Sequence, residues 1–271
     1  MEQEKPIAVA EPITVCIFDI LGVSSHLDSN NIDEIWEFYN TFANIASSTY
    51  DSVSFDVLSI TEKVHSTDHW YDSFIDIIHH AYFSDTFMFW TINHLSSIHK
   101  LVEICQDVFC RALEMQIPLR GCISSGEAIM DDEKLIYVGQ PIVESARGEN
   151  AQNWIGFAYG DSFRKGLHWD CKTFLPYHRH VKKEHKNAMF LSPFVVDWPR
   201  HWREHYKEDI RDVLRKMDTD SRFSSYYENA LKFVRFSDAH QEWWIEAEIP
   251  SSGDYNSISE KAVAWLNSLK R

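Results

Sequence analysis

Apolar residues near the start of the chain form a short, almost continuous run, ITVCIF, from Ile13 to Phe18. Runs of this kind are typical of a strand buried on both faces, so we expect a central strand here. The run ends at Asp19, and Gly22 and two serines follow. This predicts a tight turn with free backbone N–H groups beside a carboxylate, which suits a metal ion together with a phosphate. The alternative is that Asp19 only caps the next turn.

Further along, the pattern alternates between helical and strand-like spacing. Apolar positions recur at helical intervals after the capping residues Asn30 and Asn31, and again before Pro118. Two pairs of segments rich in aromatic and β-branched residues flank the turn residues Ser84-Asp85 and Asp131-Asp132, which predicts two hairpins. The predicted helices are 30–46 and 94–115, and the strands after the first are 74–83, 86–92, 119–125 and 135–138.

The resulting order, β-α-β-β-α-β, predicts an α+β fold of the ferredoxin-like kind. In that fold a right-handed crossover brings the end of the first strand next to the turn between the second and third strands. Asp19 and Asp85 should therefore lie side by side at one edge. Two carboxylates so close repel each other unless a cation lies between them, and a divalent ion with oxygen ligands, such as magnesium, meets that need.

The rest of the chain predicts one more strand and a helical end. The segment AMFLSPFVVDWP, from residue 188, resembles a last strand, and apolar residues from Trp202 to Met217 follow one helical stripe that should pack on the core or on a dimer partner. We expect a tail over 1–12, a main domain over 13–200 and a helical extension over 201–271. No Gly- or Ser-rich linker separates the extension as an independent domain.

Composition narrows the classes of function. A chain of 271 residues with 44% hydrophobic and 14% aromatic residues can bury a substantial core. Its net charge of −15 argues against a general nucleic-acid binder, because no basic field would attract phosphate backbones. No apolar run is long enough to span a membrane, and the acidic N-terminus is unlike a signal peptide, so we expect a cytoplasmic protein. Five scattered cysteines without a C-x-x-C pair indicate reduced core residues.

Four segments in this order resemble the class III nucleotidyl cyclases over roughly residues 13 to 160. FDILGVS from Phe18 resembles the family's first metal-binding strand and phosphate loop, and FSDTF from Phe83 its second metal hairpin. LRGCISSGEA from Leu119 resembles the strand before the signature helix. GQPIVESAR from Gly139 resembles the signature of Gly, Asn and Arg at intervals of four.

The resemblance implies a catalyst that attacks the α-phosphorus of a nucleoside triphosphate with its own 3′-hydroxyl and releases pyrophosphate. Two magnesium or manganese ions would serve that in-line displacement. The site would lie across a homodimer, so that Arg147 acts on the partner's nucleotide. The roles carried over are metal binding by Asp19, Asp85 and the carbonyl of Ile20, phosphate binding by Gly22, Val23 and Ser24, and stabilisation of transition-state charge by Arg147.

The departures from the family pattern concern the nucleoside. Val143 stands where the family has its ribose-binding Asn, and Glu144 or Ser145 would have to compensate. At the positions of the usual purine contacts this chain has His80-Ala81 and Ile136-Tyr137. His80 and Tyr137 are therefore candidates for contacting the base, and the alternative is that both are ordinary strand residues. FSDTF and ESARGE make the chain look most like the bacterial pyrimidine cyclases of the Pycsar anti-phage system.

That resemblance implies conversion of UTP to cyclic UMP, or of CTP to cyclic CMP, as a signal for a separate effector protein. A catalytically inactive nucleotide-binding homologue is the second interpretation, in which Arg147 merely pairs with Glu144 on a helix surface. A third comes from another class: His201, Glu204 and His205 fit H-x-x-E-H, the zinc-binding pattern of some metallopeptidases, although no third ligand is identifiable.

Overall fold

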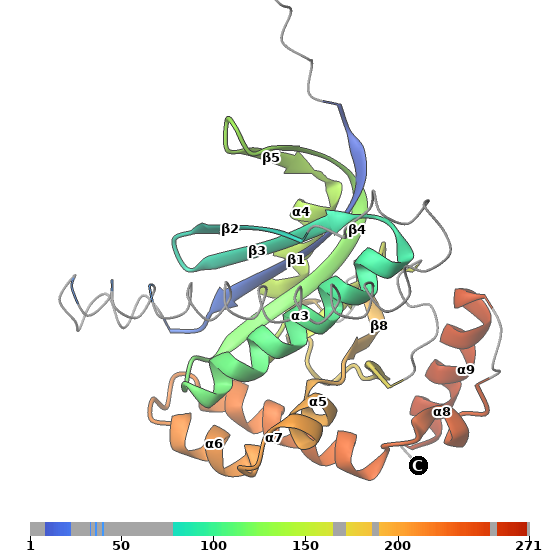
Figure 1. Cartoon of the computed structure of the whole chain (residues 1–271). Helices are drawn as coiled ribbons and strands as arrows, with labels where there is room; N and C mark the ends of the chain where they lie inside the picture. Colours follow the sequence, from blue (N-terminus) through green and yellow to red (C-terminus); the bar gives the residue numbers. More distant parts are fainter. Residues whose placement is uncertain are drawn as a thin grey trace, which may run out of the picture.

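A single mixed sheet organises the chain in the computed structural model, which describes residues 9–22, 33, 36, 40, 78–164, 172–185, 190–249 and 254–269 (Figure 1). The strand order is β2-β3-β1-β4-β6-β8-β7, and β5 pairs with β4 at one side of this path. The strands are β1 (Glu11–Ile20), β2 (His79–Phe83), β3 (Thr86–Ile92), β4 (Leu119–Asp131), β5 (Ile136–Gly139), β6 (Gly156–Gly160), β7 (Phe174–Pro176) and β8 (Leu191–Val196).

The first strand is central, as predicted. β1 pairs antiparallel with β3 on one side and with β4 on the other, and its residues from Ile13 to Phe18 are buried. Together with β2, these strands have the ferredoxin-like order β2-β3-β1-β4. The expected α+β fold is therefore confirmed. The predicted helix over 30–46 lies outside the described residues except for Asp33, Trp36 and Asn40, which are helical, and Trp36 is 69% exposed.

Helices cover the two faces of the sheet unequally. Alternate residues of β1, such as Cys16 and Phe18, pack against α3 (Leu95–Glu114) in the larger core. Val15 and Ile17 point to the other face, into a small cluster with Met88 and Trp90. On that face α4 (Gln140–Asn150) crosses β1, β4 and β6. Because odd-numbered residues of β1 share this second face, Asp19 lies on the side of α4.

The C-terminal helices belong to the larger core. They are α5 (Trp198–His205), α6 (Ile210–Met217), α7 (Ser224–Ala239), α8 (Trp243–Glu246) and α9 (Tyr255–Ser268), after a short 3-10 turn, η1 (Lys183–His185). The predicted stripe from Trp202 to Met217 does not follow one helix, because the chain is extended at Tyr206 between α5 and α6. The buried apolar residues of α5, α6, α7 and α9 nevertheless join the core formed by the sheet and α3.

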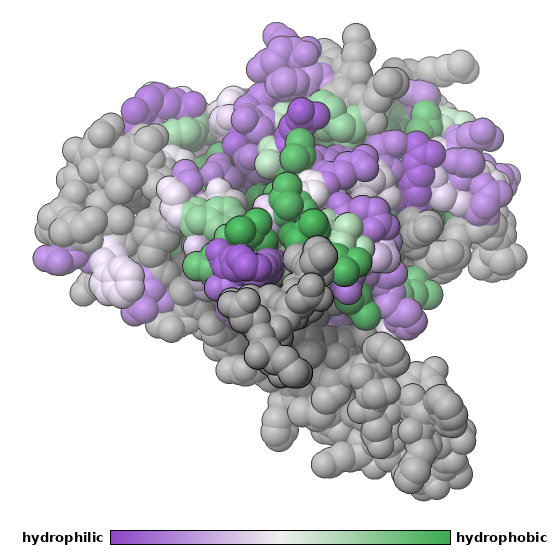
Figure 2. All heavy atoms as spheres, turned by 90° about the horizontal axis from the view of Figure 1, so that it is seen from above, coloured by the Kyte–Doolittle hydropathy of each residue, from purple (hydrophilic) through white to green (hydrophobic). Residues whose placement is uncertain are grey.

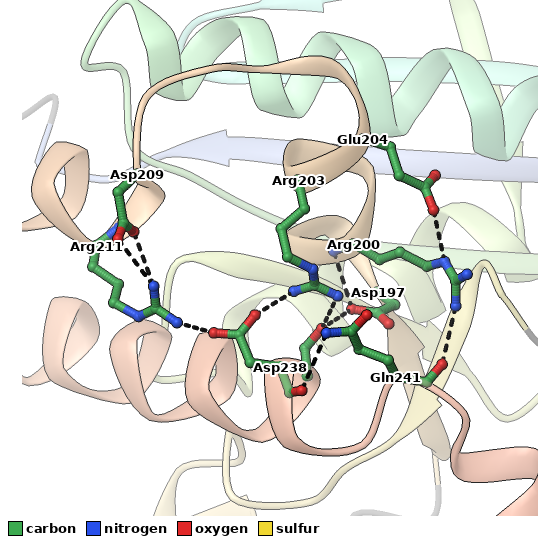
Figure 3. A network of polar contacts seen from close by, with 9 residues as sticks. Asp197, Arg200, Arg203, Glu204, Asp209, Arg211, Asp238 and Gln241 are labelled. Atoms are coloured by element: carbon green, nitrogen blue, oxygen red, sulfur yellow. Dashed lines mark hydrogen bonds and ion pairs between the residues drawn. The ribbon is translucent and has the colours of Figure 1, made fainter.

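Polar side chains connect α5, α6 and α7 (Figure 3). Asp238 of α7 accepts hydrogen bonds from Arg203, at 2.7 Å, and from Arg211. The buried Asp197 caps α5 and accepts a 2.6 Å hydrogen bond from the hydroxyl of Ser237. This network fixes the start of α5 against the end of α7.

Several boundaries differ from the sequence prediction. β4 continues to Asp131 rather than ending near residue 125, because its outer part pairs with β5. β6 and β7 were not predicted; each is short, with five and three residues, and both are fully buried, so they lack an alternating pattern. No helix among the described residues is long and apolar enough to cross a membrane.

Candidate functional site

Asp19 and Asp85 lie at the same edge of the sheet. Asp19 is paired in register with Thr86, the first residue of β3, and the backbone N–H of Ile20 donates to the carbonyl oxygen of Asp85 at 3.1 Å. Burial raises the pKa of Asp19, and the nearby negative charge of Asp85 raises it further. The geometric prediction from the βαββαβ order is therefore met: two acids from distant parts of the chain are close enough to repel each other.

The turn after β1 begins as the sequence indicates. Gly22 has φ +84°, a left-handed conformation that residues with a Cβ rarely adopt. A Cβ on Gly22 would come within 3.4 Å of the ring of Phe223, just before α7, so the C-terminal part of the chain contacts this turn. Val23 and Ser24, the other predicted phosphate-binding residues, lie outside the described residues.

Asp19 takes part in a cluster of charges beneath the edge. Burial raises the pKa of Asp19 to about 6, which Arg120 opposes and Asp85 reinforces. Burial likewise raises the pKa of Glu149, on α4, to about 7, against the lowering by Arg120. The charge of Lys182 acts on both acids. With three acids and two cations, the cluster carries one excess negative charge when all five groups are ionised.

Arg120, at the start of β4, is the centre of this cluster and is only 7% exposed. Its Nε and Nη2 contact Oε1 of Glu149, its Nη1 donates to the carbonyl of Gln152 at 3.1 Å, and its Nη2 lies 3.4 Å from Oδ2 of Asp19. The guanidinium also lies over the ring of Tyr226 of α7, 5.8 Å from its centroid. Several elements therefore hold one side chain next to Asp19.

The residues at this edge fit a divalent ion that completes its coordination with substrate. Carboxylate and carbonyl oxygens are the ligands that magnesium and manganese prefer, and such ions commonly use one or two carboxylates plus phosphate oxygens. The raised pKa of Asp19 means that an added cation would stabilise its charged form. Within the described ranges, no group of three or more His, Cys, Asp or Glu residues forms a metal site from side chains alone.

The signature segment forms α4, but its residues differ in exposure and in their hydrogen-bond partners. Val143 and Arg147, one turn apart, are exposed, and Val143 is 47% exposed. In the described part of the chain the guanidinium of Arg147 has no ion-pair partner, whereas Oε1 of Glu144 accepts a 2.9 Å hydrogen bond from the backbone N–H of Ser162. Ser145 is buried and donates to the carbonyl of Val15 at 3.2 Å. Arg147 is thus available to a second molecule, while Glu144 and Ser145 are engaged within the chain.

The two base-side candidates lie on opposite faces of the sheet. The ring of His80 is 6.4 Å from that of Phe89, a residue of the larger core. Tyr137 instead packs on Trp90, with ring centroids 5.1 Å apart, on the face of Asp19. His79 shares that second face, because it stacks on Trp90 at 5.3 Å. His79 is therefore the histidine that lies with Tyr137, a consequence of strand alternation that only the register fixes.

The H-x-x-E-H segment on α5 has other partners. Nε2 of His201 lies 3.5 Å from Oδ1 of Asp107, and Oε1 of Glu204 accepts a 3.0 Å hydrogen bond from Arg200. The rings of His201 and His205 are 4.4 Å apart. Although burial would raise the pKa of Asp107, His201 and Arg111 lower it overall. This is an ion-pair cluster between α3 and α5, and no three His, Cys, Asp or Glu side chains of the described residues are grouped as a zinc site requires.

Sequence reasoning missed Arg120, Glu149, Gln152 and Tyr226. One local signal was present, since Arg120 interrupts an apolar strand and a cation in a buried strand needs a partner. Its partners come from α4, from the segment after α4 and from α7, and nothing in the spacing of the sequence joins them.

Comparisons with known proteins support the fold. No model of a protein family matches the sequence, and no curated protein is similar to it. Among solved structures, a bacterial light-regulated adenylyl cyclase superposes with a TM-score of 0.50 and 12% identity, over 77% of this chain and 57% of that one.

Two further structures have lower TM-scores. One bacterial light-regulated adenylyl cyclase gives 0.48 at 13% identity, over 77% of this chain and 98% of that one. The catalytic core of a rhodopsin-guanylyl cyclase, in complex with ATPαS, gives 0.47 at 12% identity, over 67% and 92%. The likeness at a TM-score of 0.50 shows that the α+β core described above has the fold of that adenylyl cyclase.

Proposed function

We propose that the protein is a nucleotidyl cyclase that converts UTP to 3′,5′-cyclic UMP and pyrophosphate. The observation that carries this proposal is the juxtaposition of Asp19 and Asp85 beside the left-handed turn at Gly22, on a cyclase-like sheet. Two acids at one edge, next to a tight turn that begins with a left-handed glycine, suit a metal-bound triphosphate.

Different residues of this chain have different roles in the proposed reaction. Asp19, Asp85 and the carbonyl of Ile20 would hold magnesium or manganese, and a bound ion would supply a lower pKa for the attacking hydroxyl and positive charge for the phosphate oxygens. The turn from Gly22 through Val23 to Ser24 binds the β- and γ-phosphates through its N–H groups. Arg147 stabilises the charge that develops on the phosphate oxygens in the transition state.

Arg147 acts in a homodimer, on the nucleotide of the partner. Its exposed position on α4 supports this, because the opposite side of α4 packs on β1 and β4. Figure 2 shows hydrophobic residues gathered near the middle of one face, among hydrophilic ones. Exposed apolar residues on the β4–β5 hairpin and α4 are Leu135, Ile136, Val138 and Val143. Val143, one turn before Arg147 on α4, is among them, and exposed apolar side chains of this kind suit contact with a second copy of the chain.

A pyrimidine substrate agrees with the surroundings of the base. Trp90 itself is buried, but His79 and Tyr137, which pack on it, are half-buried and offer aromatic surface on the face of Asp19. The nucleotide product would act as an anti-phage signal for a separate effector, as the resemblance to Pycsar cyclases implies. CTP is the alternative substrate, and a nucleotide-binding homologue without turnover is the alternative function.

Incubation of the purified protein with ATP, GTP, CTP and UTP in manganese, followed by mass analysis of the products, tests the proposal. We expect one cyclic mononucleotide, from UTP. Asp19→Ala, Asp85→Ala and Arg147→Ala should each abolish its formation, whereas His205→Ala, on α5, should not. A cyclic product from CTP alone would change the substrate, and nucleotide binding without any product would favour the inactive homologue.

A mixing experiment tests the shared site. Asp19→Ala and Arg147→Ala damage different halves of a site that spans two subunits, so a heterodimer of the two keeps one intact site. Refolding or co-expressing them together in equal amounts should restore about a quarter of wild-type activity. Zero activity in the mixed dimers would show that both residues act within one chain.

A further inference from the structure

Arg120 has more hydrogen-bond partners than it would need if its only role were to neutralise a nearby negative charge. Nε and both terminal nitrogens have partners: Glu149, the carbonyl of Gln152 and Asp19. Gln152 is itself fixed, because its amide donates to the carbonyls of Gly121 and Gly148 at 2.8 Å each and its oxygen accepts from Trp154 at 2.6 Å. A planar guanidinium bound on several sides has one orientation.

That orientation determines how Asp19 lies. Nη2 of Arg120 reaches Oδ2 of Asp19, so one carboxylate oxygen is directed toward the guanidinium. A carboxylate with one oxygen engaged in this way has its rotation about χ2 restricted. Partners that orient a ligand in this manner commonly affect metal affinity or activity by about 10- to 100-fold.

The C-terminal part of the chain contributes to the same arrangement. Tyr226 of α7 lies under the Arg120 guanidinium, and the neighbouring Asn229 donates to the carbonyl of Asn153 at 2.7 Å. The ring of Phe223, three residues before Tyr226, lies next to Gly22, because a Cβ added to Gly22 would be 3.4 Å from it. The start of α7 and the residue before it therefore lie next to both the turn at Gly22 and the guanidinium of Arg120.

We propose that Arg120, held by Glu149, Gln152 and Tyr226, is a positioning residue that orients the Asp19 carboxylate for metal binding. The start of α7 is thereby part of the site. This inference rests on the proposed cyclase function, and it adds to it a residue that does not contact the nucleotide and a role for the C-terminal helices.

The test separates the effect of Arg120 on the orientation of the Asp19 carboxylate from the effect of its positive charge. Arg120→Met alone leaves Glu149 buried without its partner and risks unfolding the protein. The double variant Arg120→Met/Glu149→Gln removes one positive and one negative charge, so the net charge of the site is unchanged while the donor to Asp19 is lost. Manganese binding by the protein is followed by the loss of the free-ion EPR signal, and initial rates are followed against manganese concentration.

We expect the double variant to weaken manganese binding by about tenfold or more and to lower kcat at saturating manganese. Tyr226→Phe keeps the ring and should behave as wild type, whereas Tyr226→Ala should weaken binding by about two- to fivefold. Arg203→Met is the matched control, because it removes another paired arginine, on α5, and should lower Tm without changing manganese affinity.

The outcomes are distinguishable. A folded double variant with wild-type manganese affinity and kcat would overturn the role of Arg120. An equal loss of affinity in Arg203→Met would overturn it as well, because the effect would then come from general loosening of the fold. A wild-type protein that neither binds manganese nor cyclises any nucleotide would overturn the proposed function and this inference together.

Discussion

His180 provides a test of the packing beneath the site. It is 1% exposed, lies 4.8 Å from the ring of Trp154 and stacks near Tyr177, and neither ring nitrogen has a hydrogen-bond partner within the described residues. Burial, with a smaller effect of the neighbouring His178, lowers the pKa of His180 to about 3. The folded protein therefore holds this imidazole neutral at pH values where the unfolded chain protonates it.

The sign and size of the effect follow from this difference. The pKa is lower in the folded than in the unfolded state, so the stability that the neutral ring contributes is present above pH 6.5 and is lost as the pH falls toward 3. Each pH unit in this window costs up to about 1.4 kcal/mol. Between pH 7 and pH 5 we expect a loss of about 2 kcal/mol in the free energy of unfolding from this one residue.

The perturbation is His180→Phe, which keeps an aromatic ring and removes the titrating group. Urea unfolding, followed by tryptophan fluorescence at pH 7, 6 and 5, gives the free energy of unfolding of each protein. The difference between variant and wild type should change by about 2 kcal/mol in favour of the variant over this range. His94→Phe, which removes an exposed imidazole, is the control and should follow the wild type. Parallel curves for His180→Phe and wild type would refute the reasoning.

Three further substitutions test the fold. Gly148→Ala would drive a Cβ into the side chain of Cys122 and within 3.2 Å of Leu191, so urea unfolding should show a loss of about 1–3 kcal/mol, partly restored by adding Cys122→Ala. Asp197→Ala removes the cap of α5 and the acceptor for Ser237, and the same assay should show a loss of about 2–3 kcal/mol. Gly22→Ala places a Cβ on a left-handed residue and should lower the free energy of unfolding by about 1 kcal/mol while reducing triphosphate affinity more strongly, as titration calorimetry would show. An unchanged triphosphate affinity would exclude this turn from phosphate binding.

The sequence by itself determined the central strand, the tight turn at Gly22 and the meeting of Asp19 with Asp85. Each depends on local pattern or on a topological rule: an apolar run buried on both faces, a glycine at a tight turn, and the handedness of a crossover. These constraints act over one or two elements, so residue types and their order are enough to predict them.

The tertiary structure alone decided the charge cluster around Arg120, the contact of α7 with the site, and the choice of His79 rather than His80 on the face of Tyr137. Only the structure shows, too, that the chain is extended at Tyr206, so that one apolar stripe is divided between two helices. The physical reason is that each depends on strand register or on packing between elements distant in sequence. A shift of one residue in register turns a side chain to the opposite face, and a buried arginine binds whichever acids the fold brings to it.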